Sequence, residues 1–502
     1  MKKMITFMLA VLTIATSVMA SACSNSDANS GTVTTASPVD TDPIETEEPR
    51  ILPDLPDITF DGADFRFYSW DVENWRVWDD IWVESQNGEP INDAVFNRNS
   101  LIESTYDIKI SFKYEPHTDY NANVKKMVQA SECWYEVLLS MGHCIPSLYA
   151  SNVFYNLHDV DYLDFDKPWW DQNAIESFTL AGYMPFTVSD MTILDKAVAA
   201  AVYFNKKVAT DYNVGNLYER VLNNQWTIED MITLGKMVSE DLDGDGDYDD
   251  EDRYGIVSGD DPVFMLFHSA GGRYITKDSD GYPQLSFANE YNYTVIQYYL
   301  ENLMYDEKLT RNNAFRSDSK NISDMFMENQ SLFMFSPLKT TNSLREMEAD
   351  FGILPIPKYD ASQENYSSSA SVFGGNLISI PITTQTLEMT GIIIEAMSAE
   401  STYTLIPAFY DTVLKDKSMR DAESEEMLDI IINNMVFDVG DYYNLCNFPD
   451  HFLRITGSVY NSGNKSYPQR TSDIASFYAK WEKKLTKELE KLIEIIDEWN
   501  EI

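Results

Sequence analysis

Basic residues are scarce in this chain. Its 502 residues contain 37 Lys and Arg against 81 Asp and Glu, which gives a formal net charge of −44. A balance of this sign argues against nucleic acid and anionic lipid as partners, because both are polyanions. Neutral sugars, peptides and cations remain as candidate ligands.

Cysteine is equally scarce, with four residues at Cys23, Cys133, Cys144 and Cys446. Cys23 follows the N-terminal leader as a candidate lipidation site, so an odd number is left and a full disulfide framework is excluded. Cys133 and Cys144 are close enough in sequence to close a short disulfide loop. Two buried thiols fit the same spacing equally well. The sequence leaves this pair open.

The familiar motifs of catalysis are missing too. There is no His-Glu-x-x-His, Cys-x-x-Cys, Gly-x-Ser-x-Gly or phosphate-binding glycine loop. These absences predict a protein that is not an enzyme. With 81 acidic residues, chance carboxylate pairs keep a secreted glycoside-acting enzyme open as the alternative. The five histidines have no metal-ligand spacing: His117, His143, His158, His268 and His451.

The N-terminus predicts export. Two lysines, an apolar run over 5–20 and small residues before Cys23 make residues 1–22 a secretory signal peptide. Ala20-Ser21-Ala22-Cys23 resembles a bacterial lipobox, in which the cysteine is lipidated, although Ala20 stands where Leu is usual. An ordinary signal peptide with an incidental cysteine is the alternative. We expect a lipid anchor at Cys23 on the extracellular face of the membrane.

A polar segment follows the leader. Residues 23–55 begin with Cys23 and continue as Ser, Thr, Asp, Pro and Glu with little to bury, which predicts a disordered tether. A flexible chain of this length reaches on the order of 30 Å, enough to hold a globular body off a membrane.

The strongest local motif is a run of aspartates around Gly246. Carboxylates occupy positions 1, 3, 5, 7, 9 and 12 of a twelve-residue loop, with glycine at position 6, as in an EF-hand. Ca²⁺ requires such a ring of oxygens and a sharp turn at position 6. Position 12 is Asp where Glu is usual, which weakens binding, and a solvated charged turn is the alternative. The predicted structural Ca²⁺ ligands are Asp241, Asp243, Asp245, Asp247, Asp249 and Asp252.

The first half of the mature chain alternates strands and helices. Strand patterns over 64–70, 108–114 and 135–141 are separated by helical ones, which indicates a parallel sheet covered by helices. Ligands of such sheets bind beyond the carboxyl ends of the strands. Trp70 and His143 lie at two of these ends.

The remaining length, roughly 450 residues, is too great for one core and suits two α/β lobes. A segment with strand character over 182–192 precedes the first crossing, near residue 197. Thr227 predicts the N-cap of a helix, and a long helix is expected from 472 to the terminus. Strands are expected at 254–258, 331–336 and 376–380, the second returning to the first lobe. We assign 56–195 and 336–385 to lobe 1, and 196–335 and 386–502, with the C-terminal helices, to lobe 2.

Tryptophans gather in predicted loops, where packing in a core is a less obvious role. Flat rings stack on sugar faces at little entropic cost, although many of these rings have packing as the alternative. Polar side chains near them supply hydrogen bonds to hydroxyls. The predicted ligand-binding residues are Trp70, Trp75, His143, Trp169, Trp170, Asp171 and Asp190.

Several stretches, in this order, resemble one family, the sugar-binding extracellular lipoproteins of bacterial ABC importers. Each stretch is loose by itself, and together they span nearly the whole mature chain. They are residues 20–23, 87–95, 167–170, 226–230 with 243–246 and 253–255, 352–358, 395–401 and 406–411.

The resemblance implies two α/β lobes of the periplasmic-binding-protein type, joined by hinge segments and closing on a ligand in the cleft between them. It also implies a monomer that delivers a sugar or oligosaccharide to an ABC transporter permease, while other subunits hydrolyse ATP. A surface carbohydrate-binding or sensor-partner lipoprotein without a transport role is a second alternative. The family's ligand residues vary, so none is carried over.

Overall fold

The computed structural model describes residues 50–72, 75–132, 134–312, 320–414, 422–457 and 469–500. Residues 53–502 form one compact unit, separate from residues 1–52. The expected signal peptide, Cys23 and nearly all of the expected tether therefore lie outside the described residues. No helix in the described part is long and apolar enough to span a membrane.

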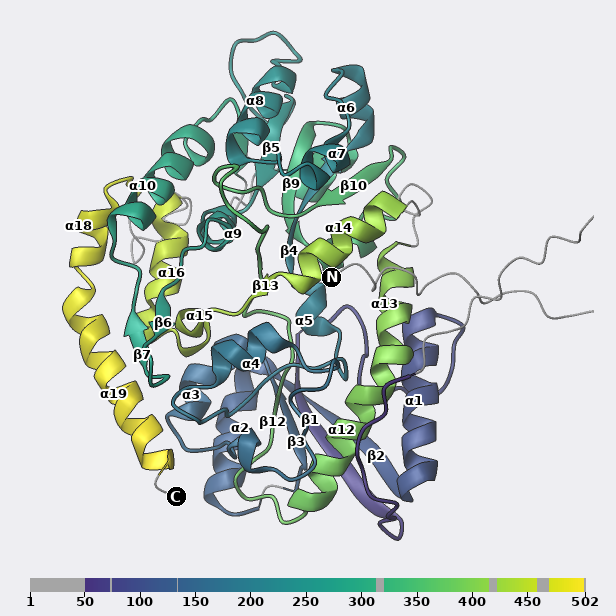
Figure 1. The fold of residues 1–502 in the computed structure, drawn as a ribbon. Coiled ribbons are helices and arrows are strands. Elements are labelled where there is room, and N and C mark those ends of the chain that lie inside the picture. The colour runs from purple at the N-terminus through teal and green to yellow at the C-terminus, as the bar shows by residue number, and fades with distance from the viewer. Residues whose placement is uncertain are drawn as a thin grey trace, which may run out of the picture. The chain divides into compact units, whose positions relative to one another are not determined.

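The first sheet has the strand order β12-β3-β1-β2 (Figure 1). β1 runs parallel to both β2 and β3, and β12 closes the other edge antiparallel to β3. Phe65 and Phe67 of the central β1 are fully buried. The strands are β1 (Ala63–Asp71), β2 (Ile108–Pro116), β3 (Val137–Ser140) and β12 (Leu377–Ser379). The expected strand–helix–strand–helix–strand order is confirmed.

Helices cover this sheet. α1 presents Ile91, Val95 and Ile102 to the core at helical spacing, and α12 and α13 pack against α1. The crossovers place α1 and α2 on different sides of the sheet (Figure 1). The helices are α1 (Pro90–Tyr106), α2 (His117–Gln129), α3 (Ile145–Tyr149), α4 (Gln172–Phe178), α5 (Leu194–Ala197), α12 (Leu387–Tyr403) and α13 (Leu405–Val413).

The second sheet has the order β10-β4-β9-β5-β8 and is mixed. β5 runs parallel to β8 and β9, whereas β4 is antiparallel to β9 and β10. Its strands are β4 (Ala200–Asn205), β5 (Tyr254–Ser258), β8 (Thr310–Asn312), β9 (Ser331–Pro337) and β10 (Phe351–Leu354). Two α/β sheets are the fold class that the sequence predicts.

α8 lies directly on the second sheet. Its N-cap is Thr227, whose side chain accepts from the Asp230 backbone N–H, as expected. A Cβ on Gly255 would come within 2.5 Å of the Gly235 Cα, so only two glycines allow this approach. The helices around this sheet are α6 (Lys206–Asp211), α7 (Leu217–Leu222), α8 (Ile228–Val238), α9 (Pro262–Ser269), α10 (Glu290–Tyr299), α11 (Ile322–Met327) and α14 (Ala422–Asn433).

Small elements complete the unit. The hairpin of β6 and β7 and the C-terminal helices α18 and α19 lie along one side of it (Figure 1). The expected single helix from residue 472 is interrupted at Lys480–Trp481. The elements are β6 (Ile275–Lys277), β7 (Pro283–Leu285), β11 (Ser368–Ser369), β13 (Met435–Val436), α15 (Val439–Tyr443), α16 (Phe448–Leu453), α18 (Ile474–Ala479) and α19 (Glu482–Asn500).

The structure corrects the expected lobe boundaries in three places. β9 was expected to return to lobe 1 but lies in the middle of the second sheet, and β10, placed in lobe 1, pairs with β4. α12 and α13, placed in lobe 2, pack on α1. A strand's own residues do not identify its partner, which explains these errors. The segment 182–192 also forms only isolated bridges where a strand was expected.

Candidate functional site

Four rings meet at one edge of the first sheet: Trp75, His117, His143 and Phe373, here called the aromatic cluster. The Trp75 ring centroid lies 5.5 Å from Phe373, 5.9 Å from His117 and 6.5 Å from His143. His143 and Phe373 stack at 5.0 Å. Phe373 is 37% exposed, so part of the cluster faces solvent.

Strand direction explains this meeting. Trp75, His117 and His143 follow the carboxyl ends of β1, β2 and β3, which are parallel and therefore end at the same edge. Phe373 precedes β12, and because β12 is antiparallel to β3 its start lies at that edge as well. Four segments distant in sequence thus supply one surface.

The imidazole of His143 is uncharged at neutral pH. Burial, with the neighbouring His117 as a smaller cause, lowers the pKa of His143 to about 4. Its Nδ1 is buried and has no hydrogen-bond partner among the described residues. A neutral imidazole has one donor and one acceptor nitrogen, so the ring offers an unused polar atom beside the aromatic faces.

Lys339 connects the aromatic cluster to the second sheet. It lies in a short helical turn directly after β9, and its Nζ donates to the Trp75 carbonyl at 3.3 Å. Burial lowers the pKa of Lys339. This contact holds the loop after β1 against a segment that leaves the other sheet.

A small cavity lies beside the cluster. Gly142 borders it next to His143, and Ser371 and Gly375 border it on either side of Phe373. The full lining is Gly142, Val188, Asp195, Val198, Ala370, Ser371, Gly375, Asn376, Leu377, Phe437 and Tyr442.

Asp195 is the acidic group of this cavity. Its Oδ2 lies 3.2 Å from the Lys196 Nζ, which also lies 3.3 Å from an Asp190 oxygen. Its Oδ1 is buried and has no partner among the described residues. Burial outweighs Lys196 and raises the pKa of Asp195 to about 7. A ligand hydroxyl would satisfy that oxygen.

The structure brings two of the predicted ligand-binding residues, Trp75 and His143, into this cluster. Trp70 is also at the right strand end, but its ring is buried and its Nε1 donates to Asn376 Oδ1 at 3.0 Å. The guanidinium carbon of Arg76 lies over the same ring, 4.5 Å from its centroid. Trp70 therefore packs beneath the loop that carries Trp75.

Trp169 and Trp170 lie in the core, with exposures of 0% and 2%. Their Nε1 atoms donate to the two oxygens of Glu395 at 3.1 and 3.0 Å. Glu395 is itself buried in α12, and burial raises its pKa to about 7. These rings fasten α12 to the segment before α4.

The two predicted aspartates have structural partners. Asp171 is the N-cap of α4 and accepts from the Ala174 backbone N–H at 2.9 Å. Asp190 pairs with Lys196 and accepts from the Thr402 hydroxyl at 2.8 Å. Only Asp190 is connected to the cavity, through Lys196 and Asp195.

Sequence reasoning missed His117, Phe373, Lys339 and Asp195. The signal for His117 was present, because it follows the second predicted strand just as His143 follows the third. Nothing local marks the other three, since their positions depend on segments that meet only in the folded chain.

The aspartate loop is partly arranged for a cation. One carboxylate oxygen each of Asp241, Asp243 and Asp252 lies within 4.8 Å of the others. Gly246 has φ of +91°, as the turn at position 6 requires. Carboxylates also brace the backbone: Asp241 accepts from the N–H groups of Gly244 and Gly246, and the buried Asp252 from those of Leu242 and Asp249.

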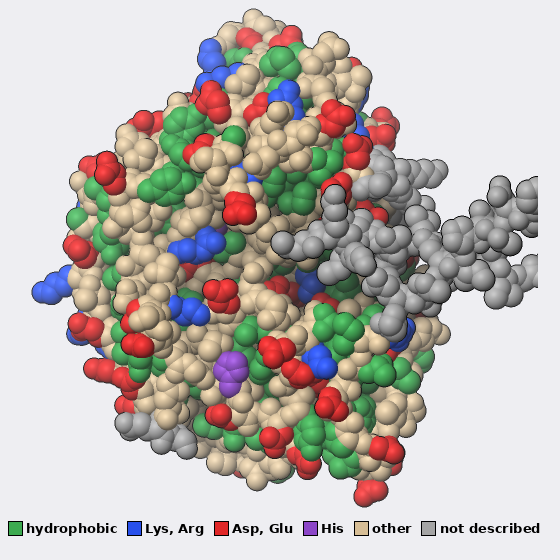
Figure 2. Space-filling view, in the orientation of Figure 1, with side chains coloured by type: hydrophobic (Ala, Val, Ile, Leu, Met, Phe, Trp, Pro, Cys, Tyr) green, Lys and Arg blue, Asp and Glu red, His purple; other side chains and the backbone are tan. Residues whose placement is uncertain are grey.

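The negatively charged aspartates of the loop repel one another. The Asp245 N–H lowers the pKa of Asp243, but slight desolvation and the nearby Asp245, Asp252 and Asp241 leave it raised overall. Acidic side chains elsewhere are spread over the face in view without gathering in one patch (Figure 2).

The structure describes one member of the predicted cysteine pair. Cys144 is a buried free thiol, and Cys133 lies outside the described residues.

Comparison with known families decides the class of protein. A family model of the bacterial extracellular solute-binding proteins matches residues 98–406. The chain belongs to this family. It is a binding protein located outside the cytoplasm, in agreement with the sequence-based prediction that it is not an enzyme. No curated protein matches it.

Solved structures of binding proteins share the fold. The sugar-binding protein MalE from Xanthomonas citri superposes with a TM-score of 0.58 at 13% identity, over 87% of this chain and 99% of that one. An ABC substrate-binding protein from Listeria monocytogenes, in complex with cycloalternan, gives 0.52 at 12% identity over 87% and 100%. The two-lobed α/β architecture of the binding protein is thereby confirmed.

Proposed function

We propose that this binding protein captures a neutral oligosaccharide at the aromatic cluster and delivers it to an ABC transporter permease. The observation that carries the proposal is the meeting of Trp75 and Phe373 with two histidines at the carboxyl edge of a parallel sheet. Aromatic faces stack on sugar rings, and His143 Nδ1 and Asp195 Oδ1 provide unused polar atoms for hydroxyls.

The relatives support the choice of ligand class. One structural neighbour is a cyclo/maltodextrin-binding protein in complex with maltotetraose, and another holds acarbose. A negatively charged chain also disfavours anionic ligands.

We infer that capture proceeds by hinge closure. Lys339, directly after β9 of the second sheet, contacts the loop after β1 of the first sheet. A ligand that contacts both sides favours the closed form over the open one, and the permease then recognises the closed form. Attachment through lipidated Cys23 and a flexible tether would keep the monomer near that permease.

A thermal-shift screen tests the ligand class. Neutral oligosaccharides from two to six units are compared with short peptides at equal concentration. A true ligand at a hundred times its Kd stabilises the folded state by about 2.7 kcal/mol. Stabilisation by peptides alone contradicts the sugar assignment. Cleavage of a labelled oligosaccharide contradicts the transport role.

We also propose that the aspartate loop binds Ca²⁺ as a structural brace. Asp241, Asp243 and Asp252 would hold the ion, since hard carboxylate oxygens are the ligands that Ca²⁺ prefers. The bound ion would offset the repulsion among the carboxylates.

Chelation tests this brace. EDTA should lower the melting temperature, and Asp243→Asn should lower it and remove the EDTA effect. Asp280→Asn, at an exposed aspartate outside the loop, is the matched control. An EDTA effect that Asp243→Asn leaves intact, or no effect at all, contradicts calcium binding here.

A further inference from the structure

A second polar group lies buried away from the aromatic cluster, between α9 and α15. His268 is near the end of α9, and Asp438 and Asp441 are at the start of α15. One ligand atom of each lies within 4.8 Å of the others. Their exposures are 0%, 2% and 5%. Two carboxylates and an imidazole in a core require a reason, because burying charge is costly without compensation.

The hydrogen bonds of His268 determine which nitrogen is available. Its Nδ1 lies 3.0 Å from the Gly272 carbonyl, which can only accept, so Nδ1 carries the proton. In the neutral ring Nε2 is then a bare acceptor. It faces Asp441 Oδ2 at 3.0 Å, another acceptor when the carboxyl is charged.

Neither partner is satisfied by the protein. His268 Nε2 and Asp441 Oδ1 are both without a hydrogen-bond partner within the described chain. The 3.0 Å contact with Asp441 Oδ2 leaves Nε2 without a hydrogen bond. A cation between the two atoms would satisfy both of them.

Asp438 completes the group while it holds the backbone. Its Oδ2 accepts from the Tyr274 N–H at 2.6 Å, and its Oδ1 from the Gly440 N–H at 2.7 Å. Oδ1 also accepts from the Ile275 N–H at 3.3 Å, so Oδ2 is the oxygen with a further lone pair for a metal. The nearby Arg273 donates its Nη1 hydrogens to the carbonyls of His268 and Gly272. Its hydrogen bonds therefore go to backbone oxygens, and its charge acts on the two carboxyl groups only from nearby.

We propose that His268, Asp438 and Asp441 bind one first-row divalent cation of the Zn²⁺ class. An imidazole with two carboxylates suits such a metal, and a buried site of this kind is distinct in chemistry from the all-oxygen aspartate loop. His268 Nε2 and Asp441 Oδ2, 3.0 Å apart, already have about the separation of two ligands of one tetrahedral Zn²⁺, roughly 3.3 Å. Asp438, whose Oδ2 lies 3.9 Å from His268 Nδ1, would have to move toward Nε2.

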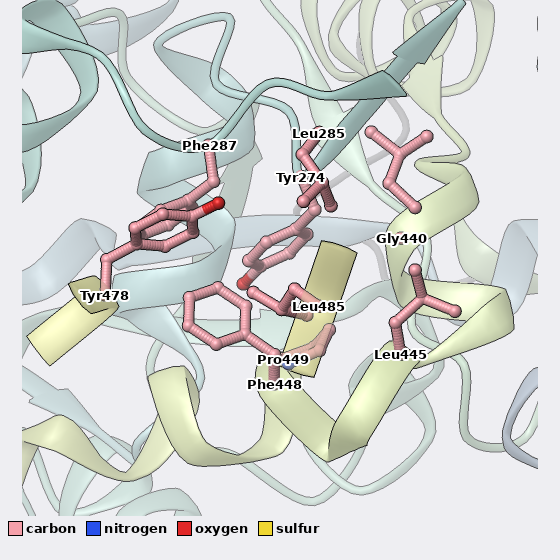
Figure 3. A pocket seen from close by; sticks show the side chains of 10 residues that line it. Tyr274, Leu285, Phe287, Gly440, Leu445, Phe448, Pro449, Tyr478 and Leu485 are labelled. Atoms are coloured by element: carbon pink, nitrogen blue, oxygen red, sulfur yellow. The ribbon is translucent and has the colours of Figure 1, made fainter. Parts of the chain in front are cut away.

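The position of the group indicates what the metal does. A Cβ on Gly440 would lie 2.3 Å from the Tyr274 Cβ, so α15 packs tightly on this side. Tyr274 and Gly440 also line the neighbouring apolar cavity (Figure 3). On the other side, the ring centroids of Tyr442 and Phe178 lie 4.8 Å apart. Those of Tyr443 and Tyr149 lie 4.9 Å apart. The cation would brace the segment that joins α9 to the helices of the first sheet.

Metal content of the full chain tests the proposal. Protein purified without chelator, and protein refolded from denaturant in the presence of ZnCl₂, are each dialysed and analysed by mass spectrometry. Refolding is included because a buried site fills most readily before the chain closes. The Asp243→Asn background removes the aspartate loop as a second site. One Zn²⁺ per chain is expected in the refolded sample.

Variants assign the ion to these residues. His268→Gln should bind Zn²⁺ at least tenfold more weakly, and His158→Gln, at an exposed histidine, should bind it unchanged. Should His268→Gln fail to fold, refolding the parent chain with Co²⁺ still decides, because Co²⁺ bound to nitrogen and carboxylate absorbs visible light more strongly than the hydrated ion. The proposal is overturned by a metal-free refolded chain, by a Co²⁺ spectrum like that of the free ion, or by full Zn²⁺ binding in His268→Gln.

Discussion

Two tryptophan-rich regions of this protein look alike in sequence and differ in the fold. The loop after β1 carries Trp75 into a partly exposed cluster with two histidines, whereas Trp169 and Trp170 are buried against Glu395. The two regions differ in the hydrogen-bond partner of the indole N–H. A buried carboxylate 225 residues away holds Trp170, whereas the described residues give the Trp75 indole no comparable anchor. Ring type alone did not separate a binding surface from a core.

The largest expected effect concerns the buried region. Trp170→Ala should lower the free energy of unfolding by about 3–5 kcal/mol, because it removes a large core side chain and leaves a cavity. Denaturant titration measures the change. Trp134→Ala, at a ring that is 67% exposed, is the control and should shift it by less than about 0.5 kcal/mol. Full stability with lost ligand affinity would reverse our assignment of Trp170.

Glu395→Ala should cost about 2–4 kcal/mol, since it leaves two buried indole N–H groups unsatisfied. The pH dependence gives a second readout. Burial raises the pKa of Glu395 from 4.5 to about 7, so its contribution to stability is present at low pH and declines as pH rises from about 4.5 to 7. Removing the carboxyl should flatten that part of the stability profile. Glu388→Ala, exposed on the same helix, should leave the slope unchanged.

The exposed region should show the opposite behaviour. Trp75→Ala should weaken oligosaccharide binding by roughly 10–100-fold, about 1.4–2.8 kcal/mol, while stability changes little. Calorimetric titration with the best ligand of the screen measures this. Trp82→Ala is the control, because Trp82 is 37% exposed and outside the cluster. Equal losses of ligand affinity in both variants would show that the aromatic cluster is not the binding site.

His143 should make the free energy of unfolding depend on pH in the acidic range. Its folded pKa of about 4 lies below the usual 6.5, so only the unfolded chain takes up the proton as pH falls from 6.5 to 4. Stability should therefore fall over this range, by about 3 kcal/mol from this residue. His143→Phe should reduce the slope in denaturation series at several pH values. An unchanged slope would mean that His143 is protonated in the folded state.

The smallest expected effect separates Asp171 from the binding residues. Asp171→Ala should cost about 1 kcal/mol, the usual loss for an N-cap, with ligand affinity unchanged. Asp171→Asn keeps an acceptor oxygen and should recover most of it. A loss of affinity in Asp171→Asn would return this residue to the site.

Much of the fold could be predicted because residues close in sequence determine where its helices and strands form. The first three strands and their helices follow from local periodicity, and Thr227 caps α8 as expected. The strand-end rule also led to His143. Its failure at Trp70 has a physical cause, since the side chain at a strand end lies at the surface only if no loop folds over it, and Arg76 does so.

The sequence by itself determined the class of protein: an acidic α/β binding protein with an aspartate-rich loop and no catalytic motif. Tertiary structure alone decided which strand joined which sheet and which tryptophan faced solvent. Both depend on contacts between residues hundreds of positions apart, such as Trp170 with Glu395 and Lys339 with Trp75. Local propensity has no information about such partners, because their energies arise only when packing brings the segments together.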